Sequence, residues 1–162
     1  MDKILIFGNS GSGKSTLAKH LSRKSGLYHL DLDSLAWLPT TPPQRMPIEE
    51  SRVQMKTFLK EQVSWVVEGC YTDLLELLIA QATEIIFMDL NVKQCLDNAK
   101  NRPWEPHKYD SKEAQDANLN MLVNWIRDYY SRANTFSHQA HLRFYNSFKG
   151  KKSAYTENPT YL

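Results

Sequence analysis

The chain has 162 residues, of which 41% are hydrophobic and 23% are charged, so its length and composition are those of one globular domain and not of a disordered chain. A net charge of +2 predicts no strong attraction to nucleic acid or to anionic membranes, and two cysteines are too few for a disulfide framework. The apolar run near the N-terminus is too short for a signal peptide or a membrane span, so we expect a cytoplasmic protein whose residues 1–162 form a single domain.

The first part of the chain alternates an apolar run, a helical pattern and a second apolar run. Residues 4–7 are continuously apolar, which is typical of a strand buried on both faces of a parallel sheet. Residues 15–25 carry apolar side chains at helical spacing, and residues 27–30 predict a second strand. Residues 38–47 contain four prolines and are predicted to form a loop without regular structure.

The middle of the chain continues this alternation. Residues 48–62 and 72–82 are predicted helices, whereas residues 65–67 and 84–88 are predicted strands. Asn91 is a favourable N-cap for a further helix with an apolar stripe. The repeated order of strand and helix is typical of a parallel sheet built from βαβ units.

The last third of the chain gives weaker signals. Residues 102–110 hold two prolines and are predicted to form a second loop. An amphipathic helix is expected over residues 119–130, and a weak fifth strand over residues 152–156. Because strand and helix alternate without an interior linker, we expect an α/β fold with a doubly wound sheet in one domain.

A phosphate-binding loop is the strongest signal in the sequence. Positions 8–16 match G-x-x-x-x-G-K-[ST] directly after the first predicted strand and before the first predicted helix. Glycines allow backbone N–H groups to converge on a triphosphate, Lys14 adds a charge for the β- and γ-phosphates, and the Ser15 hydroxyl is a hard ligand for Mg²⁺. The alternative, a glycine-rich turn that only resembles the motif, is disfavoured by the strand and helix on either side. We expect a nucleoside triphosphate to be bound by Gly8, Asn9, Ser10, Gly11, Ser12, Gly13, Lys14, Ser15 and Thr16.

Four acidic residues follow the predicted strands, at the edge of a parallel sheet where ligands gather. Asp89 follows an apolar run, the Walker B pattern in which a carboxylate holds Mg²⁺, although it is equally placed to cap the next helix. Glu68 precedes Gly69, which would let the chain pass close to a ligand; the alternative is a solvated loop acid. The predicted metal ligands are Ser15, Asp31, Glu68 and Asp89.

Asp31 and Asp33 are separated by one residue after the second predicted strand. We expect Asp31 to serve the metal and Asp33 to accept a hydrogen bond or a proton from an acceptor hydroxyl. The alternative is that the two are turn residues without a ligand.

Arginines that close over the phosphates would complete a phosphoryl-transfer site. Arg102 is the best placed, at the end of the helix that follows the fourth strand, although it could be a surface residue; Arg127 and Arg132 come later in the chain. Arg45 could bind an anionic acceptor or lie in solvent. The predicted catalytic residues are Lys14, Asp33 and Arg102.

These motifs resemble those of the P-loop small-molecule and nucleotide kinases, the group that contains adenylate kinase and shikimate kinase. Within it, the chain is most similar to the adenylate-kinase-like bacterial family labelled DNA topology modulation protein. The resemblance lies in the phosphate-binding loop, in Asp33-Ser34-Leu35-Ala36-Trp37, in Val67-Glu68-Gly69-Cys70-Tyr71 and in residues 85–90.

The resemblance implies a three-layer P-loop fold with a five-stranded parallel sheet, and ATP with Mg²⁺ at the phosphate-binding loop. It also implies an acceptor-binding loop over residues 33–50 and a short arginine-bearing lid over residues 101–111. The leading hypothesis is a kinase that transfers the γ-phosphate of ATP to a small-molecule or nucleotide acceptor. The alternative is a nucleotide-binding regulator with little or no kinase activity. A GTPase is not expected, because the guanine-reading N-K-x-D is absent.

Overall fold

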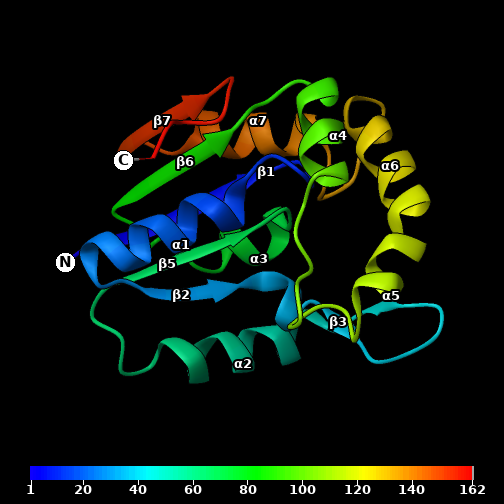
Figure 1. Cartoon of the computed structure of the whole chain (residues 1–162). Helices are drawn as coiled ribbons and strands as arrows, with labels where there is room; N and C mark the ends of the chain where they lie inside the picture. Colours follow the sequence, from blue (N-terminus) through cyan, green and yellow to red (C-terminus); the bar gives the residue numbers. More distant parts are fainter. Residues whose placement is uncertain (162) are drawn as a thin grey trace.

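The computed structural model describes residues 1–161, and a sheet of five parallel strands forms its centre (Figure 1). The strand order is β2-β5-β1-β6-β7, so the first strand of the chain lies in the middle of the sheet. The strands are β1 (Lys3–Gly8), β2 (Tyr28–Asp31), β5 (Trp65–Gly69), β6 (Glu84–Met88) and β7 (Lys151–Tyr155). The predicted α/β fold with a five-stranded parallel sheet is confirmed.

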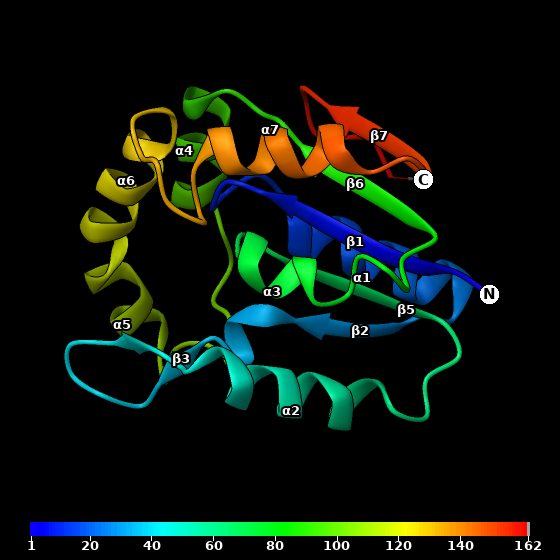
Figure 2. The same ribbon diagram turned by 180° about the vertical axis from the view of Figure 1, so that it is seen from behind.

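Helices cover both faces of this sheet, which gives three layers (Figures 1 and 2). One face packs against α1 (Lys14–Ser25) and α4 (Val92–Lys100), with α6 (Leu119–Arg127) beside α4. The other face packs against α2 (Ile48–Leu59), α3 (Thr72–Glu76) and α7 (His138–Ser147). Because side chains alternate along a strand, Ile4 and Ile6 of β1 enter the first core and Leu5 and Phe7 enter the second.

Local signals explain where the helix α4 begins. The Asn91 side chain accepts a hydrogen bond from the backbone N–H of Gln94, and the Gln94 side chain accepts one from the backbone N–H of Asn91. This capping box satisfies N–H groups that have no partner within the helix. The predicted cap at Asn91 is therefore confirmed, and the alternative role of Asp89 as the cap is wrong.

Residues 38–47 are more regular than predicted. Two short strands, β3 (Trp37–Leu38) and β4 (Gln44–Arg45), form an antiparallel hairpin in which Trp37 lies opposite Arg45. All four prolines of this segment lie outside the paired residues, so no hydrogen bond of the hairpin needs a proline N–H. The prediction of a wholly irregular loop was wrong for this reason.

The helix boundaries also differ from the predictions. The predicted helix over residues 48–62 ends at Leu59, and α3 ends at Glu76 because residues 77–81 continue as tight turns. The predicted helix over residues 119–130 ends at Arg127 and continues as a 3₁₀ turn, Asp128–Tyr130. A further helix that the apolar pattern did not indicate, α5 (Lys112–Ala117), precedes it and is capped by the Ser111 side chain. None of the helices within residues 1–161 combines the length and apolar composition that a membrane span needs.

Candidate nucleotide and acceptor site

The predicted phosphate-binding loop joins the carboxyl end of β1 to the start of α1. Gly11 and Gly13 have φ angles of +77° and +88°, a region that side chains with a Cβ rarely adopt. A Cβ at Gly11 would come within 2.3 Å of the Cys95 carbonyl oxygen of α4. The glycines of the motif are therefore required by backbone conformation and by the close approach of a neighbouring helix.

Two asparagines hold the outer side of this loop. The Asn98 side chain of α4 donates to the Gly11 carbonyl at 2.8 Å, and the Asn158 side chain donates to the Ser12 carbonyl at 3.0 Å. Asn98 also donates to the Asn158 side-chain oxygen at 2.8 Å. Because these carbonyl groups are engaged by side chains, they are held in fixed directions.

The inner side of the loop has unused hydrogen-bonding capacity. Within the described part of the chain, no side chain caps the first turn of α1, so its positive end and its free N–H groups are available to an anion. Ser12 is fully buried, yet its hydroxyl has no partner among residues 1–161, and Oδ1 of buried Asn9 has none either. Lys14 Nζ donates to the Asn9 carbonyl at 2.8 Å.

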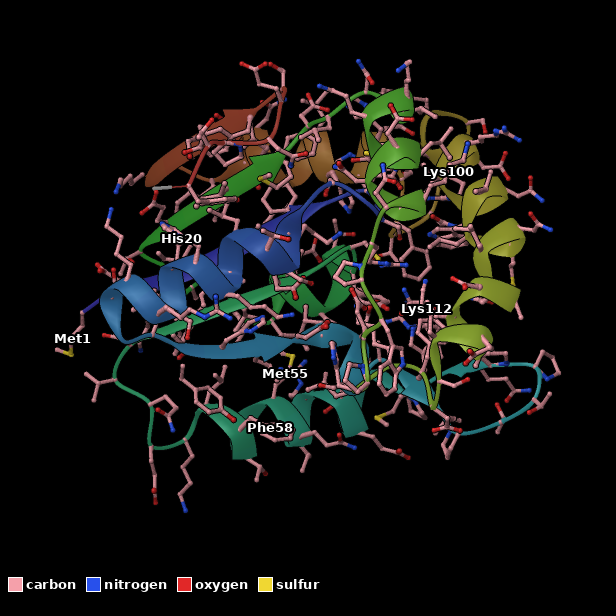
Figure 3. All side chains as sticks on the ribbon, viewed as in Figure 1. Met1, His20, Met55, Phe58, Lys100 and Lys112 are labelled. Atoms are coloured by element: carbon pink, nitrogen blue, oxygen red, sulfur yellow. The ribbon has the colours of Figure 1, made fainter. Side chains whose placement is uncertain are left out.

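A cavity of about 440 Å³ opens beside this loop. The segment between α4 and α5 closes its other side; in Figure 3, Lys100 and Lys112 mark the two ends of that segment. The lining includes the phosphate-binding loop, acids that follow two strands, and side chains from the 101–111 and C-terminal segments. It consists of Ser10, Gly11, Gly13, Lys14, Ser15, Thr16, Lys19, Asp33, Glu68, Gly69, Cys70, Asn98, Asn101, Arg102, Pro103, Trp104, Glu105, Pro106, His107, Lys108, Asn158 and Tyr161.

Glu68 brings the end of β5 to the phosphate-binding loop. The Ser15 hydroxyl donates to Glu68 Oε1 at 2.7 Å, and His29 Nε2 lies 3.3 Å from the same oxygen. Burial would raise the pKa of Glu68, but the hydrogen bond from His29 and the charge of Lys14 hold it below its usual value. The carboxylate is thus buried, ionised and in contact with a hydroxyl of the loop.

Asp31 and Asp33 meet the 101–111 segment rather than solvent. Lys108 Nζ lies 2.8 Å from Asp33 Oδ2 and 3.3 Å from Asp31 Oδ2, and His107 Nε2 lies 3.3 Å from Asp31. Lys108 also contacts Glu105 Oε2 at 3.3 Å. A network of ion pairs therefore joins the end of β2 to this segment.

The two aspartates differ in their acidity. Burial raises the pKa of Asp31, and the negative charges of Glu68 and Asp33 raise it further. Burial acts in the same direction on Asp33, but the Lys108 ammonium and a hydrogen bond from the Tyr71 hydroxyl bring its pKa below the usual value. Asp33 therefore stays ionised at neutral pH.

Tyr71 fixes the Asp33 carboxylate from the side opposite Lys108. The Tyr71 side chain is buried; its hydroxyl donates to Asp33 Oδ1 and accepts a hydrogen bond from Trp37 Nε1 at 2.8 Å. The β3–β4 hairpin is thus linked through one tyrosine to the acid at the end of β2.

Of the remaining predicted site residues, one lines the cavity and the others lie elsewhere in the fold. Arg102 lines the cavity, with Nη1 3.7 Å from Glu105 Oε1. Asp89 does not line it, and its Oδ1 lies 3.1 Å from His138 Nε2 of α7. Arg127 and Arg132 do not line it either; the Arg132 guanidinium packs 3.9 Å from the Trp125 ring centroid.

Arg45 is not free to bind an acceptor. Its Nη2 donates to both carboxylate oxygens of Asp73, at 3.0 and 3.3 Å. Its guanidinium carbon lies 5.0 Å from the Tyr71 ring centroid and 5.2 Å from that of Phe136. Ion pairing and cation–π contacts therefore hold this arginine within the fold.

Several cavity residues were not singled out from the sequence. They are Asn98, Trp104, Glu105, His107, Asn158 and Tyr161. Lys108 lies in the predicted lid, but no local pattern indicates that it pairs with Asp31 and Asp33. No local pattern marks Asn158, because its partners Asn98 and Ser12 lie 60 and 146 positions earlier in the chain.

Comparison with known proteins assigns the chain to a family. The family described as an AAA domain matches residues 4–119, which include the phosphate-binding loop, the acids after β2 and β5, and the 101–111 segment. This chain belongs to the AAA-domain family. No curated protein matches the sequence of this AAA domain.

Two solved structures resemble this AAA domain in fold. An unliganded sugar kinase from a Janibacter species has a TM-score of 0.52 and 12% identity, over 96% of this chain and 85% of that chain. The shikimate kinase of Bacteroides thetaiotaomicron has a TM-score of 0.52 and 13% identity, over 96% and 86%. These two neighbours show that the chain has the P-loop fold that both kinases share. The closer similarity to the DNA topology modulation family stays a prediction.

Proposed function

We propose that this AAA domain transfers the γ-phosphoryl group of ATP to a hydroxyl group of a small molecule. The observation that carries the proposal is the common cavity of Lys14, Ser15, Glu68 and Asp33, which joins a phosphate-binding loop to an ionised carboxylate. The segment 101–111 acts as the lid and residues 33–50 contribute the acceptor side, within one domain over residues 1–162.

The phosphate-binding loop supplies the nucleotide site. The N–H groups of residues 11–15 and the positive end of α1 bind the phosphate oxygens, and Lys14 leaves the Asn9 carbonyl to reach the γ-phosphate. The uncharged side of the cavity, near Asn98, Asn158 and Tyr161, is suited to the nucleoside.

The residues around Ser15 fit a magnesium ion. Mg²⁺ prefers hard oxygen ligands and binds in proteins through one or two carboxylates together with substrate phosphates. The Ser15 hydroxyl and the buried, ionised Glu68 carboxylate supply such ligands 2.7 Å apart. Bound there, the ion would neutralise charge on the β- and γ-phosphates. We retain Ser15 and Glu68 as ligands; Asp31, held by Lys108, and Asp89, paired with His138, have other partners.

Asp33 orients the acceptor. Its carboxylate accepts a hydrogen bond from the acceptor hydroxyl, whose oxygen forms the new bond to the γ-phosphorus. The bond from that phosphorus to the β,γ-bridging oxygen breaks, and its electron pair leaves with ADP. The hydroxyl proton passes to Asp33 and then to water. Because the pKa of Asp33 is low, its main contribution is orientation rather than strong basicity.

Arg102 completes the charge balance from the lid. Its guanidinium lines the cavity and is bound loosely, at 3.7 Å, to a single carboxylate oxygen of Glu105. A move toward the γ-phosphate would stabilise the charge that spreads over its oxygens during transfer.

A second candidate function is a nucleotide-binding regulator with little or no transfer activity. It is favoured by the contacts of Asp33, because Lys108 and Tyr71 already occupy both carboxylate oxygens. In that case ATP would bind and the lid would respond, without consumption of an acceptor.

Two measurements test the proposal. Calorimetric titration with MgATP is expected to show binding that Lys14→Ala abolishes, whereas Lys24→Ala, in the exposed last turn of the same helix, leaves it unchanged. A coupled assay of ADP formation against a panel of hydroxyl compounds is expected to show acceptor-dependent turnover. Unchanged ATP binding by Lys14→Ala contradicts the nucleotide site, and binding without turnover favours the regulator.

A further inference from the structure

The acceptor half of the cavity, on the side away from the phosphate-binding loop, carries more acidic than basic groups. Three carboxylates gather in its wall or directly behind it, and they come from the end of β2 and from the lid. The acids are Asp31, Asp33 and Glu105. The opposing cations of the lid are Arg102 and Lys108, which leaves an excess of one negative charge when the histidines are neutral, and of two once Arg102 has moved to the γ-phosphate.

This half of the cavity already holds an alkylammonium group that the chain itself supplies. Lys108 Nζ contacts one oxygen each of Asp31, Asp33 and Glu105, at distances between 2.8 and 3.3 Å. Burial alone would lower the pKa of Lys108, but the charges of Asp33 and Asp31 raise it above its usual value. Because Lys108 belongs to a loop and not to the sheet, its ammonium can be replaced when the lid moves.

Among residues 1–161, no guanidinium in this half is left for an anionic acceptor. Arg45 is held by Asp73 and three aromatic rings, and Arg102, which lies against Glu105, is the group proposed to move to the γ-phosphate. Lys14 and Lys19 line the cavity on the side of the phosphate-binding loop. A phosphate or carboxylate on the acceptor would therefore face three carboxylates, Asp31, Asp33 and Glu105, that already share the single ammonium of Lys108, which is unfavourable.

We propose that the acceptor is an amino alcohol or an amino sugar, whose protonated amine binds between Asp31 and Glu105 in place of the Lys108 ammonium. The hydroxyl to be phosphorylated then lies beside the carboxylate of Asp33, which contacts the same Lys108 ammonium as Asp31 and Glu105. This inference rests on the proposed kinase function. The amine takes no part in the transfer itself: the new bond to phosphorus forms at the hydroxyl oxygen, ADP leaves, and the hydroxyl proton is the one released.

The rest of the lining fits the carbon skeleton of such a molecule. Trp104 is 43% exposed, and its ring borders the cavity together with Pro103 and Pro106. Apolar faces of this kind bind the C–H surface of a sugar or a short chain, while polar groups at one end fix its orientation.

Three probes that share one ring and differ in charge test the acceptor class. The full chain, saturated with Mg²⁺ and a non-hydrolysable ATP analogue, is titrated calorimetrically with glucosamine, glucose and glucuronate. We expect glucosamine to bind at least ~10-fold more tightly than glucose, because charge-assisted hydrogen bonds are the stronger ones, and glucuronate to bind most weakly. Equal or tighter binding of glucose or glucuronate overturns the proposal, as does the absence of glucosamine binding at millimolar concentration.

A matched pair of lid and surface variants separates charge from shape. Glu105→Gln keeps the size of the side chain and is expected to weaken glucosamine binding by ~5–10-fold, with glucose and the ATP analogue unaffected. Glu113→Gln, on the exposed surface of α5, is the control and should change nothing. An equal loss for glucosamine and glucose would mean that Glu105 only shapes the lid, and it would contradict the proposal.

The failures of the two proposals are distinguishable. If the ATP analogue does not bind, the nucleotide-site assignment fails before the acceptor class is reached. If the analogue binds and ADP forms with AMP or glucuronate as the acceptor, the kinase function stands and the amine-bearing acceptor is wrong.

Discussion

The two halves of the cavity, the proposed nucleotide half and the proposed acceptor half, are built from different parts of the polypeptide. The nucleotide half uses the main chain of consecutive residues, with glycines at positive φ and an uncapped helix start. The acceptor half uses charged side chains that come from the end of β2 and from the lid. Main-chain geometry is fixed by the fold, whereas ion pairs can exchange partners. The nucleotide half is therefore suited to one constant ligand, and the acceptor half to selection and lid movement.

The largest effect is expected where the acceptor half meets the reacting atoms. Asp33→Asn keeps the size of the side chain and removes the charge that we propose orients the acceptor hydroxyl. Acceptor-dependent turnover should fall by ~10²–10⁴, while the affinity for ATP stays near that of the wild type. Steady-state kinetics and ATP titration measure the two quantities. Asp97→Asn, on α4 and paired with Lys93, is the control.

Equal losses of turnover and ATP affinity in Asp33→Asn would mean that the two halves are not separable.

Asp31→Asn tests the other aspartate at the end of β2. The metal role expected for Asp31 from the sequence would give this variant a higher Mg²⁺ requirement. The contacts of Asp31 with Lys108 and His107 instead predict a looser lid, seen as faster hydrogen exchange over residues 101–111. A changed Mg²⁺ requirement with unchanged exchange would restore the metal role of Asp31.

The next largest effect concerns the main chain of the nucleotide half. Gly11→Ala places a Cβ 2.3 Å from the Cys95 carbonyl oxygen and forces alanine to a φ of +77°. We expect a loss of ATP affinity of at least ~100-fold, about 3 kcal/mol, because the loop must change shape. Gly26→Ala is the control: φ is +66° there, but nothing lies within 4 Å of the added atom. Normal ATP binding by Gly11→Ala would show that the loop conformation does not determine affinity.

The difference between the halves also explains what the sequence could reveal. The phosphate-binding loop is one continuous motif between a strand and a helix, so the elements of the nucleotide half were predictable, as were the five strands. Glu68 and Asp33 were predictable as acids that follow strands. Their partners were not, because Lys108, Tyr71 and Asn158 reach them or the loop across long sequence separations. The β3–β4 hairpin was missed because the four prolines of residues 38–47 predicted a loop, although none of them lies at a paired position.

The buried His141 makes the stability of the whole fold depend on pH. Its effect must be known before a change of the lid at low pH can be distinguished from unfolding of the domain. Burial lowers the pKa of His141 to about 3. Its Nε2–H donates to the Cys70 carbonyl at 2.8 Å, so Nδ1 accepts from the Tyr129 hydroxyl at 2.6 Å. The unfolded chain binds a proton near pH 6.5 and the folded chain does not until about pH 3. This stabilisation is present above pH ~6.5 and is lost as the pH falls toward 3, by ~1.4 kcal/mol per pH unit.

Urea unfolding at several pH values measures that slope. In His141→Gln, the part of the slope due to this histidine should disappear, although the variant is less stable throughout. If hydrogen exchange over residues 101–111 becomes faster at a pH at which the wild type is still fully folded, the change belongs to the lid of the acceptor half and not to unfolding of the domain. An unchanged slope in His141→Gln would mean that another group dominates the acid response.

The smallest effect is expected at the outer side of the nucleotide half, where side chains hold main-chain carbonyl groups. Asn158→Ala removes the hydrogen bond to the Ser12 carbonyl and the acceptor of the Asn98 amide, but it leaves every N–H group of the loop in place. One hydrogen bond of this kind contributes ~0.5–1.5 kcal/mol, so the KM for ATP should rise by ~3–10-fold with little change in kcat. Asn124→Ala, on the exposed side of α6, is the control.

Asn98→Ala should raise the KM for ATP in the same way. The double variant should lose less affinity than the two single losses together, because the two asparagines share one hydrogen bond. A fall in kcat without a change in KM would instead link Asn158 to the transfer step, and the division of labour between the two halves would then be wrong.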